Sequence, residues 1–207
     1  ARILTTAELG IYFLFQMSIG LLAIPASFGR GNAIIKRPSE VDSNRSEILS
    51  IGIVLLIISN ILISTTIYMF GGNMNEFIGS NVGGFLAIGI ILRSVYALGV
   101  NTLRGELKVG QAAIISFSQR LFWFAFSLIL INFGMREQAL IIGLISSYVV
   151  SFVISTSMIS TGVSAPSLES SKNLVSYWKF TTLSFVDTQL YNWADIAIIG
   201  IFLTQSD

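Results

Sequence analysis

FGRGNAIIKRPSEVDSNRSE, residues 28–47, is the stretch of this sequence that decides the fold. It places Arg30, Lys36, Arg37 and Arg45 in one short segment between two runs that carry almost no charge. Short segments rich in Lys and Arg between apolar runs stay on the cytoplasmic side of a membrane, because these residues resist translocation. The stretch therefore predicts a cytoplasmic loop, and that loop sets the direction of every other crossing.

The composition indicates an integral membrane protein. Of the 207 residues, 53% are hydrophobic and only 11% are charged. The mean hydropathy is +0.78, and a soluble domain would carry about 25% charged residues. Each crossing needs about 20 apolar residues, so a chain of this length holds about six crossings. The predicted fold class is all-α, a polytopic transmembrane helix bundle with spans at residues 11–27, 48–70, 83–103, 117–133, 139–160 and 177–203.

The loop cations alternate along the chain as the two sides of a membrane would require. Beyond the first stretch, the segments predicted to lie inside hold Arg104, Lys108, Arg120 just within the next helix, Lys172 and Lys179. The segments predicted to lie outside hold only Arg2 and Arg136. The predicted topology-setting residues are Arg30, Lys36, Arg37, Arg45, Arg104 and Lys108. Both chain ends then lie outside, which, with Ala1 in place of Met, suggests a fragment that lacks a preceding span.

Several function classes are excluded or disfavoured by what the sequence lacks. The net charge is +1, with no basic run interleaved with aromatics, so no nucleic-acid partner is expected. Cysteine and histidine are both absent, which removes disulfides, thiolate nucleophiles, histidine bases and the commonest zinc ligands. An acid pair for hydrolysis, Asp187 and Asp195, has no recognisable motif around it. We therefore expect no enzyme activity, no catalytic residue, no metal and no cofactor.

Arg93 is the first candidate site residue. It lies near the middle of the third predicted span, where an arginine costs about 2.5–3.5 kcal/mol on insertion scales. Two interpretations stay open: a structural ion pair or snorkelling side chain, and a cation that lines an internal cavity.

The sixth predicted span carries the second candidate set. At helical spacing, one face gathers five polar residues, Ser184, Asp187, Thr188, Tyr191 and Asp195. A membrane helix must turn such a face to protein or water, so we predict that it lines a cavity. The alternative is an amphipathic helix in the membrane interface, although such helices favour basic polar faces. In the fifth span, Ser147, Ser151 and Ser155 recur every four residues, which favours close helix packing.

Four stretches, in chain order, resemble one known family. ARILTTAELGIYFLF (residues 1–15) is similar to the connector after the first helix of polysaccharide-biosynthesis flippases, which belong to the multidrug/oligosaccharidyl-lipid/polysaccharide (MOP) exporter superfamily. FGRGNAIIKRPSE resembles that family's basic loop, with Ser27 where the family has Asp and Pro38 where an apolar residue is usual. NTLRGELKVG (residues 101–110) resembles its "L-R-G-x-x-K" loop, and WADIAIIGIFLTQSD (residues 193–207) the helix that opens its second half.

The resemblance implies a two-lobe transporter of twelve to fourteen helices. Residues 1–173 would then form the N-terminal transmembrane lobe without its first helix, and residues 174–207 the opening helix of the C-terminal lobe. A short internal echo agrees: LTTAE at residues 4–8 and LTQSD at residues 203–207 would follow the first helix of each lobe.

The implied function is to flip a polyprenyl-(pyro)phosphate-linked oligosaccharide across a prokaryotic cytoplasmic membrane for glycan export. The implied partners are that lipid-linked oligosaccharide, membrane lipids and proteins of glycan assembly. Arg93 would meet the phosphate or a carboxylate, while Asp187 and Asp195 would hydrate the cavity, pair with Arg93 or couple transport to H⁺ or Na⁺. Three alternatives remain: a multidrug or organic-cation antiporter of the same superfamily, a membrane enzyme of glycan assembly, and a scaffold without transport.

Overall fold

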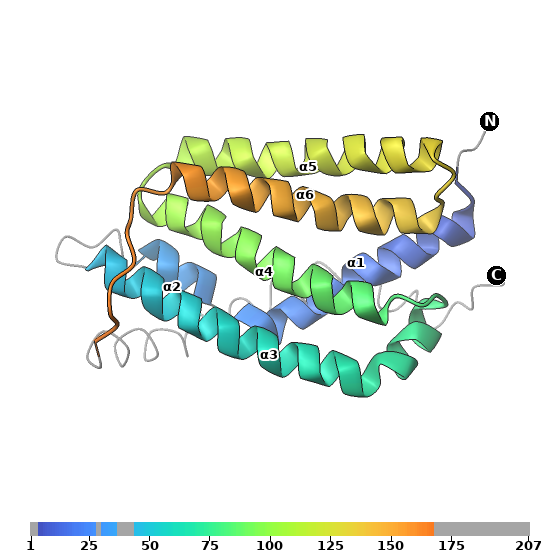
Figure 1. Cartoon of the computed structure of the whole chain (residues 1–207), viewed down its shortest axis with the longest axis horizontal. Helices are drawn as coiled ribbons and strands as arrows, with labels where there is room; N and C mark the ends of the chain where they lie inside the picture. Colours follow the sequence, from blue (N-terminus) through green and yellow to red (C-terminus); the bar gives the residue numbers. More distant parts are fainter. Residues whose placement is uncertain (1–3, 28–29, 37–43, 168–207) are drawn as a thin grey trace.

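The computed structural model describes residues 4–27, 30–36 and 44–167, and within this part every regular element is a helix. The helices are α1 (Thr6–Ser27), α2 (Arg30–Lys36), α3 (Arg45–Ile78), α4 (Gly83–Gly105), α5 (Val109–Asn132) and α6 (Glu137–Met158). Five of them, all but α2, are long and apolar enough to cross a membrane. The predicted polytopic bundle is thus confirmed for the described residues (Figure 1). The sixth predicted span, residues 177–203, lies outside them.

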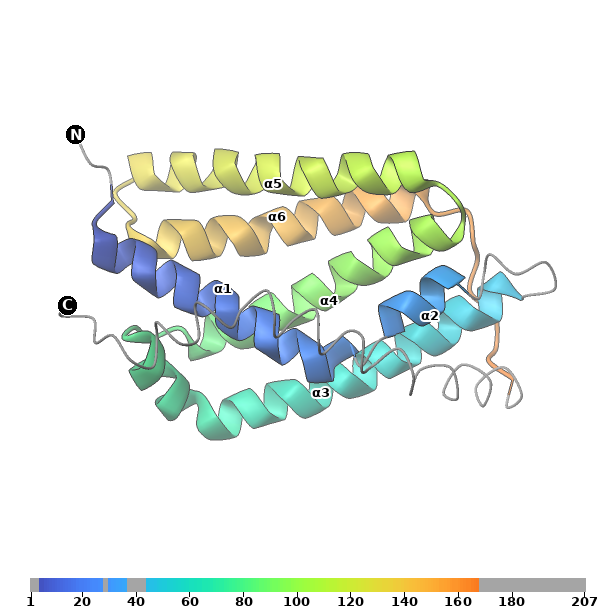
Figure 2. The same ribbon diagram turned by 180° about the vertical axis from the view of Figure 1, so that it is seen from behind.

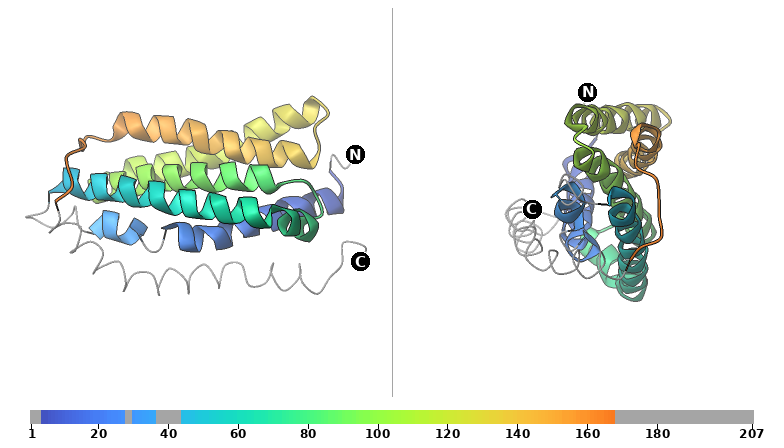
Figure 3. Two further views of the ribbon diagram at one scale, coloured as in Figure 1. Left: turned by 60° about the horizontal axis from the view of Figure 1, so that its bottom comes forward. Right: turned by 90° about the vertical axis from the view of Figure 1, so that its left-hand side faces the viewer.

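The bundle has two distinct ends (Figure 1). We call the basic end the one that holds α2, the start of α3, the α4–α5 loop and the end of α6. The opposite end holds the start of α1 and the α3–α4 and α5–α6 turns. Figure 3 shows α5 and α6 side by side at one edge of the bundle and α3 at the other, with α1 and α4 between them.

Small residues let α2 pack into the bundle beside α3 and α4 (Figure 2). A methyl group at Gly52 of α3 would lie 2.8 Å from Ile34 Cδ1, and one at Gly31 would lie 2.6 Å from Asn101 Nδ2. Ala33 and Ile34 are buried as a result. The prediction of one loop across residues 28–47 is therefore wrong in part, because residues 30–36 form a packed helix.

The main core joins α1, α3, α4 and α6. Phe15, Ile19, Leu86, Ile90 and Ile141 are essentially fully buried there, and within a membrane such helix packing is stabilised by van der Waals contacts between the side chains. Because the buried faces of four helices meet in this core, it fixes the position of α4 between α1 and α6.

The largest differences between the helix ends and the predicted span limits are extensions of the helices. α3 was predicted to end at residue 70 but continues to Ile78, and α5 was predicted to begin at residue 117 but begins at Val109. Hydropathy locates the apolar part of a helix, whereas the ends are set by backbone hydrogen bonds that polar and glycine residues also make. Gly79 then ends α3 with a φ of 76°, its N–H donating to Asn75 O.

Candidate functional site

Arg93 extends from the buried face of α4 at mid-length. It is the eleventh residue of this 23-residue helix, and its helical neighbours Leu86, Ile90 and Val100 are at most 5% exposed. Arg93 itself is only half-buried. A residue that lines a cavity has its side chain on the inward face of a helix and part of that side chain accessible, and Arg93 meets both conditions.

Two tyrosines lie next to Arg93. The rings of Tyr96 on α4 and Tyr148 on α6 have their centroids 5.4 Å apart, tilted by 32°. The guanidinium of Arg93 is close enough to Tyr148 to interact with its hydroxyl electrostatically. We call Arg93, Tyr96 and Tyr148 the central cluster. A guanidinium with phenol groups beside it can bind a phosphate or carboxylate through charge-assisted hydrogen bonds.

Further polar side chains lie at the same depth as the central cluster. On α5 and α6, Gln119 Nε2 donates a 2.8 Å hydrogen bond to Ser147 Oγ. On α3, Asn60 is 5% exposed, and its two amide atoms have no hydrogen-bond partner in the structure of the described residues. The antiparallel register of α3 and α4 brings Gly52 to Leu98 and Asn75 to Gly83, so Asn60 lies level with Arg93.

The carboxylates of the described residues all lie far from this depth. They sit at helix ends or in a loop: Glu8, Glu47, Glu76, Glu106 and Glu137. Arg93 consequently has no ion-pair partner within residues 4–27, 30–36 and 44–167. The other predicted site residues, Ser184, Asp187, Thr188, Tyr191 and Asp195, lie outside the described residues, and their pairing with Arg93 stays a prediction.

The described topology residues gather at the basic end. Arg30 begins α2 and Lys36 ends it, Arg45 begins α3, Arg104 lies in the last turn of α4, and Lys108 precedes α5. Arg37 lies outside the described residues. At the opposite end, Arg136 forms a 3.3 Å ion pair with Glu8. These loop cations thus lie at one end and Arg136 at the other, while their topology-setting role and the side of the membrane on which each end lies stay predictions.

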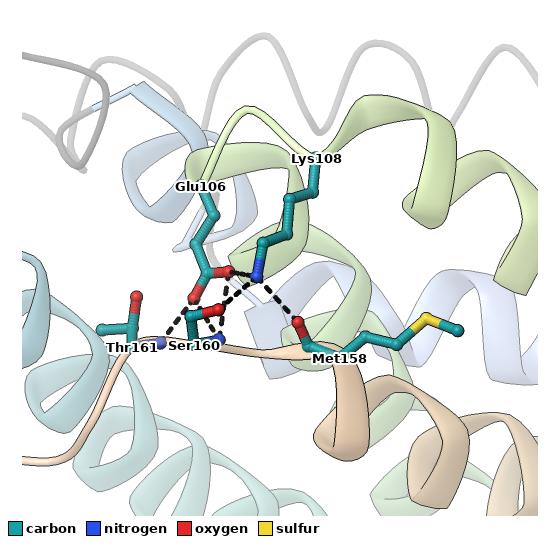
Figure 4. A network of polar contacts seen from close by, with 5 residues as sticks. All are labelled: Glu106, Lys108, Met158, Ser160 and Thr161. Carbon is teal, nitrogen blue, oxygen red and sulfur yellow. Dashed lines mark hydrogen bonds and ion pairs between the residues drawn. The ribbon is translucent and has the colours of Figure 1, made fainter.

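A polar network at the basic end holds the chain that follows α6 (Figure 4). Lys108 Nζ lies 2.7 Å from Glu106 and donates to Met158 O at 2.8 Å and Ser160 Oγ at 2.5 Å. Glu106 in turn accepts from the N–H groups of Ser160 and Thr161 at 3.0 and 2.7 Å. All three ammonium donors of Lys108 have partners, so this cation serves the network and has none left for a ligand.

The network changes the acidity of Glu106. Its side chain is 4% exposed, and this burial alone would raise its pKa. Hydrogen bonds from Lys108, Thr161 and the backbone of Ser160 outweigh burial and lower the pKa of Glu106 from 4.5 to about 2. The carboxylate is therefore ionised throughout the physiological range.

The same segment continues across the basic end to α3. Ser164 N donates to Ser50 Oγ at 3.0 Å, and Ser167 Oγ donates to Glu47 at 2.9 Å. We call residues 159–167 the strap, because they tie the α4–α5 loop to the start of α3 (Figure 1). Sequence reasoning missed the strap, Tyr96 and Tyr148, since only the folded register of distant segments brings these groups together.

Comparison with known proteins identifies the family of the chain. The family model described as polysaccharide biosynthesis protein matches residues 1–207. The probable low-salt glycan biosynthesis flippase Agl15 of Haloferax volcanii is 38% identical over 206 residues, which cover all of this chain and 43% of that protein. The chain thus spans less than half the length of this relative. No solved structure matches the chain. With the whole chain matched by the family model, the protein belongs to the polysaccharide biosynthesis protein family.

Proposed function

We propose that this chain is the N-terminal part of a flippase that moves a lipid-linked oligosaccharide across the cell membrane. The family match and the flippase name of the Haloferax relative support the class of function. The central cluster supports the substrate chemistry, since Arg93 offers a positive charge at mid-depth without a described carboxylate to neutralise it. This last observation carries the proposal.

The proposed mechanism requires binding and a change of access, and no covalent chemistry. The head group of the substrate is polar and anionic, so its passage through the hydrocarbon is costly unless a polar path replaces its hydration. Arg93 would bind the phosphate, and Tyr96 and Tyr148 would contribute ring faces and hydroxyl groups to the same path. Asp187 and Asp195 would hydrate the facing wall or couple the cycle to H⁺ or Na⁺.

The proposed orientation places the basic end in the cytoplasm, where Lys and Arg are retained. The lipid-linked substrate would then enter from the inner leaflet, with glycan-assembly proteins on that side. The strap lies at this end, on the chain that leads into residues 174–207, which we assign to the second lobe.

The test uses full-length protein in proteoliposomes that contain a fluorescent lipid-linked oligosaccharide. A flippase makes glycan from the inner leaflet accessible to an impermeant glycosidase, at a rate that depends on the protein. Export of a cationic dye without glycan movement would instead establish an antiporter, and a covalent change in the lipid-linked glycan an enzyme. A full-length protein with none of these activities would indicate a scaffold.

A further inference from the structure

Arg120 is a second cation at mid-depth, and its position differs from the sequence-based expectation. The sequence placed it just inside a helix that starts at residue 117, near the cytoplasmic surface. Because α5 begins at Val109 and has 24 residues, Arg120 is its twelfth residue. At 1.5 Å per residue, α5 is about 36 Å long and Arg120 is about 16 Å from its start. It therefore lies within the hydrocarbon.

Arg120 lies on an exposed apolar face of α5. Phe117 is 68% exposed, Leu121 53% and Phe124 57%, and Ile114 and Leu128 continue the same face. Arg120 is exposed among them, while Gln119 on the buried side is bonded to Ser147. We call this surface, with Arg120 at mid-length along one side of it, the α5 face. It lies at the edge of the bundle, where α5 packs mainly on α4 and α6, while Trp123 on the other side of α5 stacks on Tyr12 of α1 (Figure 3).

An arginine in this position needs an anionic partner. Arg120 has no ion pair or hydrogen bond with any residue of the described ranges, and the described carboxylates lie at the helix ends. A charged side chain inside the hydrocarbon is costly, and such residues as a rule pair with an opposite charge or line a functional path. The partner must combine a negative charge with an apolar body, because the exposed Phe117 and Phe124 lie within about one helical turn on either side of the cation.

We propose that the α5 face binds the apolar chain of a polyprenyl phosphate, with the phosphate at Arg120. This proposal rests on the proposed function and adds an entry site to it. Helical side chains tilt toward the helix N-terminus, so Arg120 reaches toward the basic end. Its guanidinium would draw the phosphate below head-group level before the phosphate reaches Arg93. Meanwhile the aromatic side chains on the α5 face would hold the isoprenoid chain in the bilayer.

The test measures binding to full-length protein in nanodiscs. The probes are a polyprenyl monophosphate and the uncharged polyprenol of the same chain length. The wild-type protein should prefer the phosphate by about tenfold or more, as a charge-assisted contact would give. Arg120→Leu should abolish that preference and leave polyprenol binding unchanged, and Arg120→Lys should keep part of it. Arg104→Gln, which removes an exposed cation at the end of α4, is the matched control and should bind both lipids like the wild type.

Four results would overturn the proposal. The first is an Arg120→Leu protein that keeps the phosphate preference, and the second is an equal loss in Arg104→Gln. Equal competition by phosphatidylglycerol would show a general anionic-lipid site. Failure of Arg120→Leu to accumulate, with recovery when an acid elsewhere in the full chain is neutralised, would show an ion pair with another helix.

Two further variants distinguish failure of the proposed entry site from failure of the proposed function. The double variant Phe117→Ala/Phe124→Ala should weaken the binding of both lipids about equally, because it removes apolar contact and keeps the charge. Unchanged binding of both lipids would also contradict the proposal that the α5 face binds the apolar chain. Arg93→Leu should lose flipping but still bind polyprenyl phosphate at Arg120. If Arg120→Leu flips and binds normally while Arg93→Leu does not flip, the entry site fails and the proposed function stands. If the wild-type protein neither binds polyprenyl phosphate nor flips, both fail.

Discussion

Gln119 on α5 donates a buried 2.8 Å hydrogen bond to Ser147 on α6, and the Ser147 hydroxyl donates to Leu144 O at 2.7 Å. This relationship sets the register of two helices that form one edge of the bundle. The pair lies at the same depth as the half-buried Arg93, which has no ion-pair partner among the described residues. At this depth, the Gln119–Ser147 pair has its hydrogen bond within the described residues, whereas Arg93 is the residue for which we propose a partner in the substrate.

In the Gln119–Ser147 pair, removing one partner should cost more stability than removing both, as expected for a buried hydrogen bond. Ser147→Ala leaves the Gln119 amide unpaired and should destabilise the full-length protein by about 0.6–1.7 kcal/mol. Adding Gln119→Leu removes the unpaired amide and should restore part of the loss. Unfolding in a detergent titration measures both. Additive effects of the two changes would mean that these side chains do not interact.

Gly99 should be the least replaceable glycine of α4. A methyl group there would overlap Ser155 Oγ on α6 and lie 3.0 Å from Ser155 Cβ. Gly99→Ala should therefore lower the melting temperature, and Ser155→Gly should recover part of it. Gly84→Ala is the matched control in the same helix, since nothing lies within 4 Å of that position. A Gly99→Ala protein as stable as Gly84→Ala would contradict the close approach of α4 and α6.

The strap should loosen only in strong acid. Because the pKa of Glu106 is lowered from 4.5 to about 2, its contribution to stability is complete above pH 4.5 and is lost as the pH falls toward 2. A nitroxide at Ala165→Cys, an exposed strap position, reports the mobility of the strap by electron paramagnetic resonance. Its spectrum should stay constant from neutral pH to about pH 5 and sharpen below about pH 4.

Glu106→Gln gives the matching control for the strap. It should make the Ala165 label mobile at every pH, because the neutral amide can no longer pair with Lys108. Two results would show that the Glu106–Lys108 network does not hold the strap in place. One is a change in label mobility near neutral pH in the wild-type protein, and the other is equal label mobility in Glu106→Gln and the wild type.

The orientation of the bundle can be tested with single cysteines, since the native chain has none. Asn73→Cys, exposed near the α3–α4 turn, should react with an impermeant maleimide from outside intact cells, and Ala165→Cys should react only after permeabilisation. The neighbouring Asn75 should not be replaced by cysteine for this labelling. Its Oδ1 accepts hydrogen bonds from Val82 N and Gly83 N at 2.9 and 2.7 Å, and these bonds fix the turn. The reverse labelling pattern would invert the membrane orientation.

Much of the fold was predictable because apolar runs of membrane length have few alternatives. All five described long helices fall on predicted spans, and only their ends were misplaced, most clearly at Val109. That error mattered, because it placed Arg120 near the start of the helix, whereas the structure places it at mid-helix. The LTTAE echo also gains a local explanation: Thr5 and Glu8 exchange hydrogen bonds at the start of α1, an ordinary helix-capping pattern.

The sequence could predict the candidate site only where a charged residue lies within an apolar run. Arg93 stands out in the sequence because it is a charge within an apolar run. Tyr96 and Tyr148 do not stand out, because tyrosines are common in membrane helices and their pairing depends on how α4 and α6 meet. The same holds for the strap, whose hydrogen-bond partners lie between 52 and 120 residues away along the chain.

The role of Arg93 in substrate passage is the central claim, and flipping by Arg93→Leu tests it most directly. The measurement is the rate of glycan flipping by full-length protein in proteoliposomes, at matched protein levels. The account predicts that Arg93→Leu accumulates and folds normally but does not flip, that Arg93→Lys keeps part of the rate, and that Arg104→Gln flips like the wild type. Wild-type flipping by a well-folded Arg93→Leu protein would contradict the account. So would loss of folding in Arg93→Leu that an Asp187→Asn or Asp195→Asn change restores, since Arg93 would then serve a structural ion pair.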